Sequence, residues 1–150
     1  MRALLEYAAT ISSALFAGAA LYVTVVEHPA RLQAGIAIAA AEFPPSYHRG
    51  ARLQAPLALI GFVAALLAWF LGGGTGWLVG SVLLFLPIPF TILVIAPVTR
   101  QLLQPGAGAQ PEAAASLLER WGRLHLVRTL LGIGALSLFL FLLQTRDRAP

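Results

Sequence analysis

Four apolar stretches of membrane-spanning length most constrain what this chain can fold into. They cover residues 7–26, 53–71, 77–95 and 124–143. A helix that crosses a bilayer needs about 20 mostly apolar residues, and each stretch is near that length. Hydrocarbon offers no partner for backbone N–H and C=O groups, so a spanning segment pairs them internally as a helix. The sequence therefore predicts an all-α integral membrane four-helix bundle, up-down-up-down, with residues 1–150 as a single domain.

The composition supports this class and excludes several others. Hydrophobic residues make up 59% of the chain and charged residues only 11%, whereas a soluble domain has roughly 25% charged residues. An ordinary soluble enzyme and a disordered tail are thereby excluded. All ten basic residues are arginines, and they form no basic run of the kind that binds nucleic acid. Cysteine is absent, which excludes disulfides, thiolate metal sites and CxxC redox chemistry.

The connections between the apolar stretches differ in character. Residues 72–76 read GGGTG, a short uncharged turn that predicts an antiparallel hairpin. Residues 27–52 form a predicted long loop with Pro44 and Pro45 in its middle. Within that loop, residues 34–41 are apolar and helix-prone, which is typical of a helix that lies in the membrane interface between spans one and two.

The last connection predicts where the fourth helix begins. Pro111 occupies a position typical of the first residue of a helix, and Glu112 follows in the first turn. We expect this helix to run from about Pro111 to about Leu143 and to protrude from the bilayer.

Arginine asymmetry predicts the orientation in the cell membrane. Four spans place both termini and the glycine turn on one face, and both long loops on the other. The loop face carries seven of the ten arginines, namely Arg31, Arg49, Arg52, Arg100, Arg120, Arg123 and Arg128. Basic residues mark the cytoplasmic side of multi-pass proteins. We therefore predict cytoplasmic long loops, with both termini on the opposite side.

The fourth helix carries a polar stripe. Trp121, His125 and Arg128 follow one another at helical spacing and share one face. Arg128 lies about one turn inside the apolar boundary, where an arginine needs a carboxylate, carbonyl groups or an anionic ligand. Glu27 ends the first span at the same depth and is the predicted partner. In the alternative without a functional site, Arg128 extends to the lipid headgroups and His125 is a hydrogen-bonded structural residue.

Further polar residues gather on the same face and predict a pocket near one membrane surface. The candidate catalytic residues are His125, Arg128, Glu27 and His28. The candidate substrate-binding residues are Trp121, Tyr47, Arg31 and Gln54. Taken singly, Tyr47 and Trp121 are also typical of an interfacial aromatic belt.

Three segments together resemble one family. They are Glu27-His28-Pro29-Ala30-Arg31, Ser46-Tyr47-His48-Arg49 and Trp121-x-x-x-His125-x-x-Arg128. The chain resembles the anthrone oxygenase-like family, small four-helix membrane proteins largely of unknown function. Thr99 departs from that pattern, because the family often has Asn two residues after the proline of span three. The resemblance implies an oxygenase or oxidoreductase that acts on an apolar aromatic or quinol-like substrate.

In the first hypothesis the chemistry is direct reaction with dioxygen. An anthrone has an acidic C–H group, and a histidine is suited to remove its proton near neutral pH. His125 would be the base, and Arg128 would stabilise the resulting anion. Trp121 and Tyr47 would form the pocket walls. This version needs no cofactor and is favoured over a metal or haem, although the sequence leaves the cofactor unknown.

Two alternatives remain open from the sequence. A metal or haem would be held by the candidates His28, His125, Glu27 and His48, because imidazole and carboxylate suit iron, copper or zinc. A non-enzymatic protein would bind a lipid or a small anionic molecule through Arg128 and Arg31. In every version the protein contacts the lipid bilayer and does not bind nucleic acid. The sequence does not decide whether the protein forms a homo-oligomer.

Overall fold

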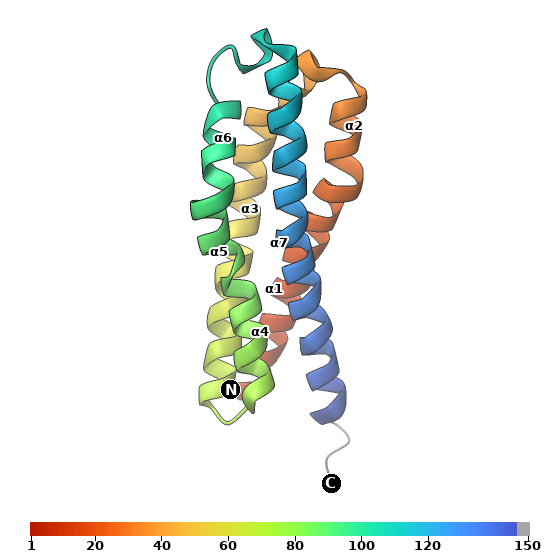
Figure 1. Cartoon of the computed structure of the whole chain (residues 1–150). Helices are drawn as coiled ribbons and strands as arrows, with labels where there is room; N and C mark the ends of the chain where they lie inside the picture. The colour runs from red at the N-terminus through yellow and green to blue at the C-terminus, as the bar shows by residue number, and fades with distance from the viewer. Residues whose placement is uncertain (147–150) are drawn as a thin grey trace.

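The chain folds into four antiparallel helical passes (Figure 1). The computed structural model describes residues 1–146, and the side chains of residues 1–145. The first pass consists of α1 (Arg2–Tyr22), a π-helical turn η1 (Val23–Glu27) and α2 (His28–Gln33). The second is α3 (Ile36–Phe70). The third consists of α4 (Thr75–Phe85), α5 (Pro87–Phe90), a second π-helical turn η2 (Thr91–Ile95) and α6 (Ala96–Leu102). A short 3-10 turn η3 (Ala107–Ala109) leads to the fourth, α7 (Pro111–Arg146).

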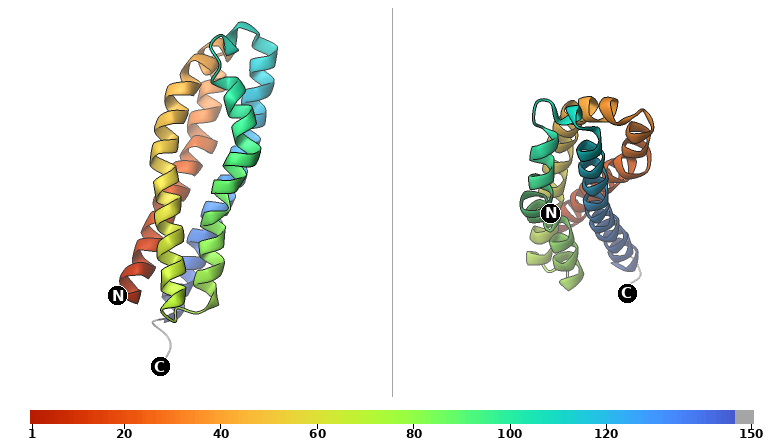
Figure 2. Two further views of the ribbon diagram at one scale, coloured as in Figure 1. Left: turned by 90° about the vertical axis from the view of Figure 1, so that its left-hand side faces the viewer. Right: turned by 45° about the horizontal axis from the view of Figure 1, so that its top comes forward.

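The passes pack as an up-down-up-down bundle. The helix α1 packs against α3 and α7, and α4 packs against the same two helices. The two turned views show the resulting elongated bundle, with the connections at its two ends (Figure 2). Within the described residues, all four passes are long and apolar enough to cross a membrane. The predicted all-α, multi-pass membrane fold is confirmed, while the side that the loop end faces stays a prediction.

Both local predictions about the ends of the later helices are confirmed. Gly72 and Gly74 have φ angles of 83° and 77°, a backbone conformation that only glycine adopts at little cost. They reverse the chain between α3 and α4, as the glycine-rich turn predicted. The fourth helix begins at Pro111, where the proline lacks an N–H group that would have no partner in the first turn of a helix anyway.

The first connection differs from its prediction. No long loop separates the first two passes, because α2 reaches Gln33 and α3 begins at Ile36. The predicted interfacial helix is instead the N-terminal part of α3, which continues through Pro44 and Pro45. Two prolines remove two backbone donors and disfavour a helix. Burial of Phe43 in the core outweighs this cost here, since tertiary packing routinely overrides local propensity.

Prolines also explain the two π-helical turns. The turn η1 ends two residues before Pro29, and η2 ends two residues before Pro97. A proline cannot donate the hydrogen bond that a regular helix needs, so the preceding turn can widen to the i→i+5 pattern. Such turns are frequent at functional sites. Here η1 contributes to the polar layer described below.

The bundle interior contains two apolar clusters. One lies toward the chain termini and includes Phe16, Leu84 and Phe139. The other lies toward the opposite end, hereafter the loop end, and includes Phe43 and Trp121. Polar side chains from three of the four passes lie between these clusters, most of them buried, and they form the site.

Candidate functional site

A layer of polar side chains crosses the bundle between the two apolar clusters. Thr24 comes from η1, Gln54 from α3, and His125, Arg128 and Thr129 from α7. Thr24 is half-buried and the other four are buried. Buried polar groups are costly in an apolar bundle unless they are paired. The partners of each side chain therefore define what the layer can do.

The predicted stripe of α7 faces the interior. Trp121, His125 and Arg128 are 5%, 3% and 9% exposed. Arg128 therefore points into the bundle and does not extend outward along its surface, and Trp121 likewise is not on the lipid-facing surface. The indole of Trp121 stacks on the His125 ring, with the ring centres 4.8 Å apart. Helical spacing alone was sufficient to find these three residues.

The His125 ring is held by two threonines that the sequence analysis missed. Its Nδ1 atom lies 3.2 Å from the hydroxyl oxygen of Thr24. That hydroxyl lies 3.0 Å from the Ala20 carbonyl oxygen and 2.8 Å from the Thr129 hydroxyl. When Thr24 donates its one proton to Ala20, its oxygen accepts the Nδ1–H group of His125. The Nε2 atom then keeps its lone pair, as a general base requires.

Arg128 has a neutral partner, so the predicted pairing with Glu27 is wrong. Its Nη2 atom donates to the Gln54 side-chain oxygen at 3.1 Å, and its guanidinium lies 5.8 Å from the centre of the Phe16 ring. Its Nε–H group is buried without an acceptor in the described chain. Within residues 1–145, Arg128 forms no ion pair with a carboxylate. Its positive charge is therefore not neutralised by the protein.

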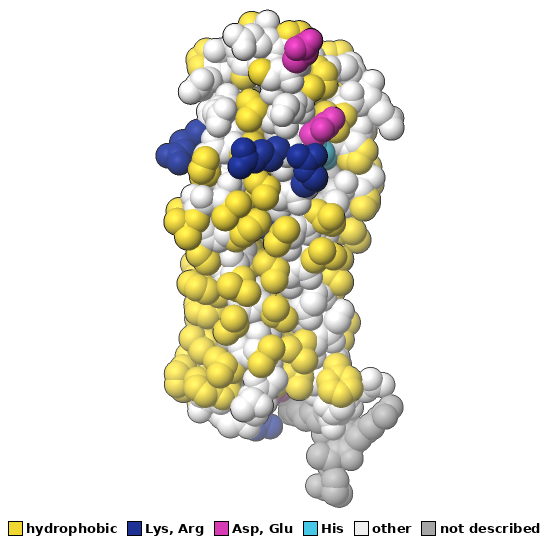
Figure 3. Space-filling view, in the orientation of Figure 1, with side chains coloured by type: hydrophobic (Ala, Val, Ile, Leu, Met, Phe, Trp, Pro, Cys, Tyr) yellow, Lys and Arg dark blue, Asp and Glu magenta, His cyan; other side chains and the backbone are white. Residues whose placement is uncertain are grey.

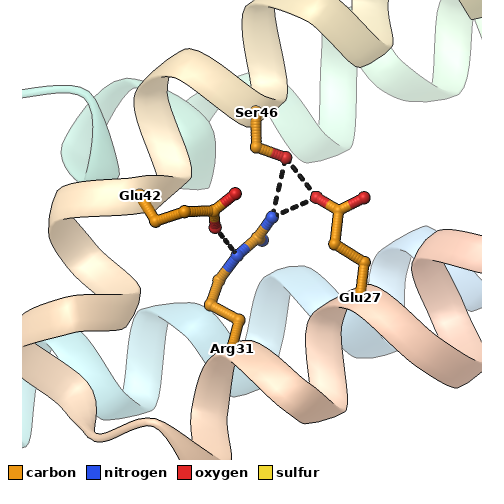
Figure 4. A network of polar contacts seen from close by, with 4 residues as sticks. All are labelled: Glu27, Arg31, Glu42 and Ser46. Atoms are coloured by element: carbon orange, nitrogen blue, oxygen red, sulfur yellow. Dashed lines mark hydrogen bonds and ion pairs between the residues drawn. The ribbon is translucent and has the colours of Figure 1, made fainter.

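Glu27 instead belongs to a network with Arg31, Glu42 and Ser46 (Figure 4). Arg31 forms ion pairs with Glu27, four residues before it, and with Glu42 from α3. Ser46 accepts a hydrogen bond from Arg31 at 2.8 Å and donates one to Glu27. This network joins the first pass to α3. The sequence analysis missed Glu42, whose i, i+4 spacing to Ser46 becomes meaningful only once both lie on one helix.

The three histidines occupy different surroundings. His28 is buried against α7, with its ring centre 5.3 Å from that of Trp121. Trp121 thus contacts both His28 and His125. His48 is exposed and lies outside the polar layer, with its ring against Tyr47.

Two cavities adjoin the polar layer. The smaller one, of about 30 Å³, is bordered by His125, Trp121 and Arg128, and by Ser46 and Gln54. A cavity of this size holds one or two small molecules such as water. The larger one, of about 210 Å³, lies between α3 and the α5–η2 segment and is mostly apolar. Tyr47, Ala51 and Arg128 line both cavities. Arg128 therefore places a cation where an apolar space meets a polar one.

The described residues do not fit a multi-ligand metal site. No three side chains of His, Cys, Asp or Glu come together within the part of the chain that the structure describes. Among the metal candidates, Glu27 is engaged by Arg31, and His48 is exposed whereas His125 is buried.

The fold and the pocket define a class: a small four-pass helical membrane protein with a buried histidine and a buried arginine beside an apolar cavity. A family model described as "Anthrone oxygenase" matches residues 43–138. The chain belongs to this family, as the sequence resemblance predicted. The matched segment contains Tyr47, Gln54, Trp121, His125 and Arg128, all of which border the smaller cavity. Comparison with curated proteins and with solved structures finds no match.

Proposed function

We propose that this protein is a membrane oxygenase that acts on an apolar aromatic substrate with an acidic C–H group, by direct reaction with dioxygen. One observation carries the proposal most strongly: His125 and Arg128 border the same small cavity, and Arg128 has only a neutral partner. A base beside an uncompensated cation favours removal of a proton to leave an anion. Membership of the anthrone oxygenase family supports the same class of substrate.

In the proposed reaction, each residue acts on a stated group. The Nε2 atom of His125 takes a proton from a ring methylene carbon that is conjugated with a carbonyl group across the central ring, and the electron pair moves through the aromatic rings to the carbonyl oxygen. Arg128 stabilises this enolate oxygen. Dioxygen adds to the carbon, and the peroxide takes the proton back from His125 to form a hydroperoxide. Loss of water leaves a carbonyl, so that CH2 and O2 become C=O and H2O.

The two cavities suit a substrate of this shape. The outer apolar rings would extend into the larger cavity, while the central ring, which carries the carbonyl and methylene groups, would lie near Arg128 and Tyr47, which line both spaces. Trp121 adds a buried indole N–H group without an acceptor in the described chain. Unpaired buried donors are costly, and an oxygen atom of a bound substrate would satisfy this one.

The experiment is oxygen uptake by the purified protein with 1,8-dihydroxyanthrone, corrected for the protein-free rate. We expect one dioxygen consumed per quinone formed. H125Q and R128Q should each lower the corrected rate by about 100-fold or more, since a general base and an anion-stabilising group each contribute about that much. R2Q, at the opposite end of the bundle, is the matched control and should keep the wild-type rate.

A second variant separates loss of chemistry from loss of folding. Q54E places a carboxylate of the same shape beside Arg128, which neutralises its charge without removing its partner. We expect Q54E to fold with wild-type thermal stability and to lose most of the turnover. Wild-type uptake no faster than the protein-free rate would reject the oxygenase proposal. Binding of the anthrone without turnover would favour a non-enzymatic binding protein, and a rate that follows a removable metal would favour metal chemistry.

A further inference from the structure

Five exposed arginines lie on the outside of the bundle, near the level of the small cavity. They come from three helices and are Arg49 and Arg52 on α3, Arg100 on α6, and Arg120 and Arg123 on α7. We call this set the arginine girdle. The proposed oxygenase reaction uses none of them, so they need a separate explanation.

The girdle arginines lie at one level along the bundle. On α3 they flank Gly50, which lines the small cavity together with Trp121 of α7. On α6, Arg100 lies between Val98 and Leu102, which are buried in the same apolar cluster as Trp121. The space-filling view shows the basic side chains of one face gathered in a band below the loop end (Figure 3). Their common level indicates a common environment.

The girdle guanidinium groups have little to bind within the protein. Arg123 has the one ion pair found for the girdle within residues 1–145, at 3.8 Å from Glu119, and both side chains are largely exposed. Such an exposed pair contributes little. Arg2, at the opposite end, differs because it pairs with Glu6 and donates to the Gly72 carbonyl at 3.1 Å. The girdle therefore presents free cations, whereas Arg2 does not.

The distance along α7 places the girdle at a membrane surface. From Arg123 to Thr145 the helix rises about 33 Å at 1.5 Å per residue, close to the roughly 30 Å of a hydrocarbon core. Most of the exposed residues between the girdle and Phe141 on this helix are large and apolar, including Leu126, Leu130 and Phe141. Above the girdle, α7 exposes Glu112, Ser116 and Glu119. The boundary between hydrocarbon and water therefore falls at the arginines.

We propose that the arginine girdle binds the phosphate groups of anionic phospholipids and thereby fixes the depth of the bundle in the bilayer. An arginine fork matches a phosphate group with two parallel hydrogen bonds, and basic residues beside a membrane attract anionic lipids. The small cavity then lies level with the headgroups. The larger cavity, which extends toward Ala58 and Pro87, lies on the hydrocarbon side. This proposal does not depend on the oxygenase reaction.

The first test measures lipid preference. The full-length protein in a neutral detergent is titrated with phosphatidylglycerol and, separately, with phosphatidylcholine, and bound lipid is counted by native mass spectrometry. We expect tighter binding of phosphatidylglycerol, and R100Q should weaken it about fivefold. Replacement of all five girdle arginines by glutamine should abolish the preference. R2Q should retain it, because Arg2 is already paired.

The second test measures depth, and the absence of cysteine from the chain makes it direct. Single cysteines at Ala113, Ser116, Leu126 and Leu130 of α7 are spin-labelled in vesicles that contain phosphatidylglycerol. Collisions with dioxygen and with a water-soluble nickel chelate then report depth for either orientation. We expect the first two labels in water and the last two in hydrocarbon. Water exposure of the last two, burial of the first two, or equal binding of both lipids would overturn the proposal.

Discussion

At the scale of single residues, the Nδ1 atom of His125 faces one hydroxyl group, that of Thr24, which is placed to select the tautomer of the ring. If the Thr24 hydroxyl donates its proton to the Ala20 carbonyl, its oxygen accepts the Nδ1–H group of His125. The base is thus defined by a side chain from another helix, 101 positions away in the sequence. This arrangement makes Thr24 a positioning residue for the proposed reaction, although Thr24 itself does not border the cavities.

T24V tests this role because valine keeps the shape of threonine and removes the hydroxyl. We expect kcat/KM for the anthrone to fall about fivefold, as loss of one hydrogen bond of about 1 kcal/mol implies. T24S keeps the hydroxyl and should retain most of the activity. The nitrogen chemical shifts of the His125 ring supply a direct readout: T24V should shift the tautomer toward Nε2–H. An unchanged tautomer in T24V would contradict the assignment.

The residue scale also shows which parts of the site were accessible from the sequence. Trp121, His125 and Arg128 were found because their relation depends only on the period of a single helix. The partner of Arg128 was not found, because the rotation of the first pass about its axis decides whether Glu27 faces Arg128. The extra residue in a π-helical turn rotates the following residues by about 100°, and η1 ends at Glu27. No local pattern distinguished Gln54 from Glu27 as the partner.

At the scale of helices, close packing rests on glycines that face large side chains. A Cβ atom placed on Gly80 would lie 2.1 Å from the Phe139 ring, and one on Gly122 would lie 2.6 Å from Nε2 of His28. These contacts bring α4 and the first pass against α7.

The uninterrupted length of α3 is a second feature of the helices that packing determines. A local analysis that placed Pro44 and Pro45 in a loop could not detect that Phe43 is buried in the core. Local sequence therefore predicted four helices but not the full length of the second one.

A pair of glycine variants tests this packing. G80A should lower the free energy of unfolding by about 1–3 kcal/mol, because the Phe139 ring has to shift or the helices have to separate. G18A is the matched control, since a Cβ atom at Gly18 meets nothing within 4 Å. It should leave stability unchanged or raise it by up to about 1 kcal/mol, the helix preference of alanine over glycine. Unfolding in mixed detergent micelles measures both, and equal stability of the two variants would contradict the packing argument.

At the scale of the whole molecule, the cavities and the bilayer form one system. The larger cavity lies between α3 and the α5–η2 segment, and its lining includes the exposed residues Ala55 and Ile92. It therefore reaches the apolar surface that four spanning helices present to lipid. An apolar substrate concentrated in the bilayer would enter sideways, between α3 and α5, and meet Arg128 at the inner end. This entry route is inferred from the position of the larger cavity between two helices.

Closing this entrance gives the corresponding prediction. A55W places an indole in the mouth of the larger cavity, so kcat/KM for 1,8-dihydroxyanthrone should fall about tenfold or more, as expected when bulk blocks a pocket that the substrate must occupy. L59W is the matched control, because Leu59 is exposed on the same helix and lines neither cavity. Both variants keep every side chain of the polar layer, so the His125 tautomer should be unchanged in each. If A55W and L59W turn over the anthrone equally fast, the substrate does not enter between α3 and α5.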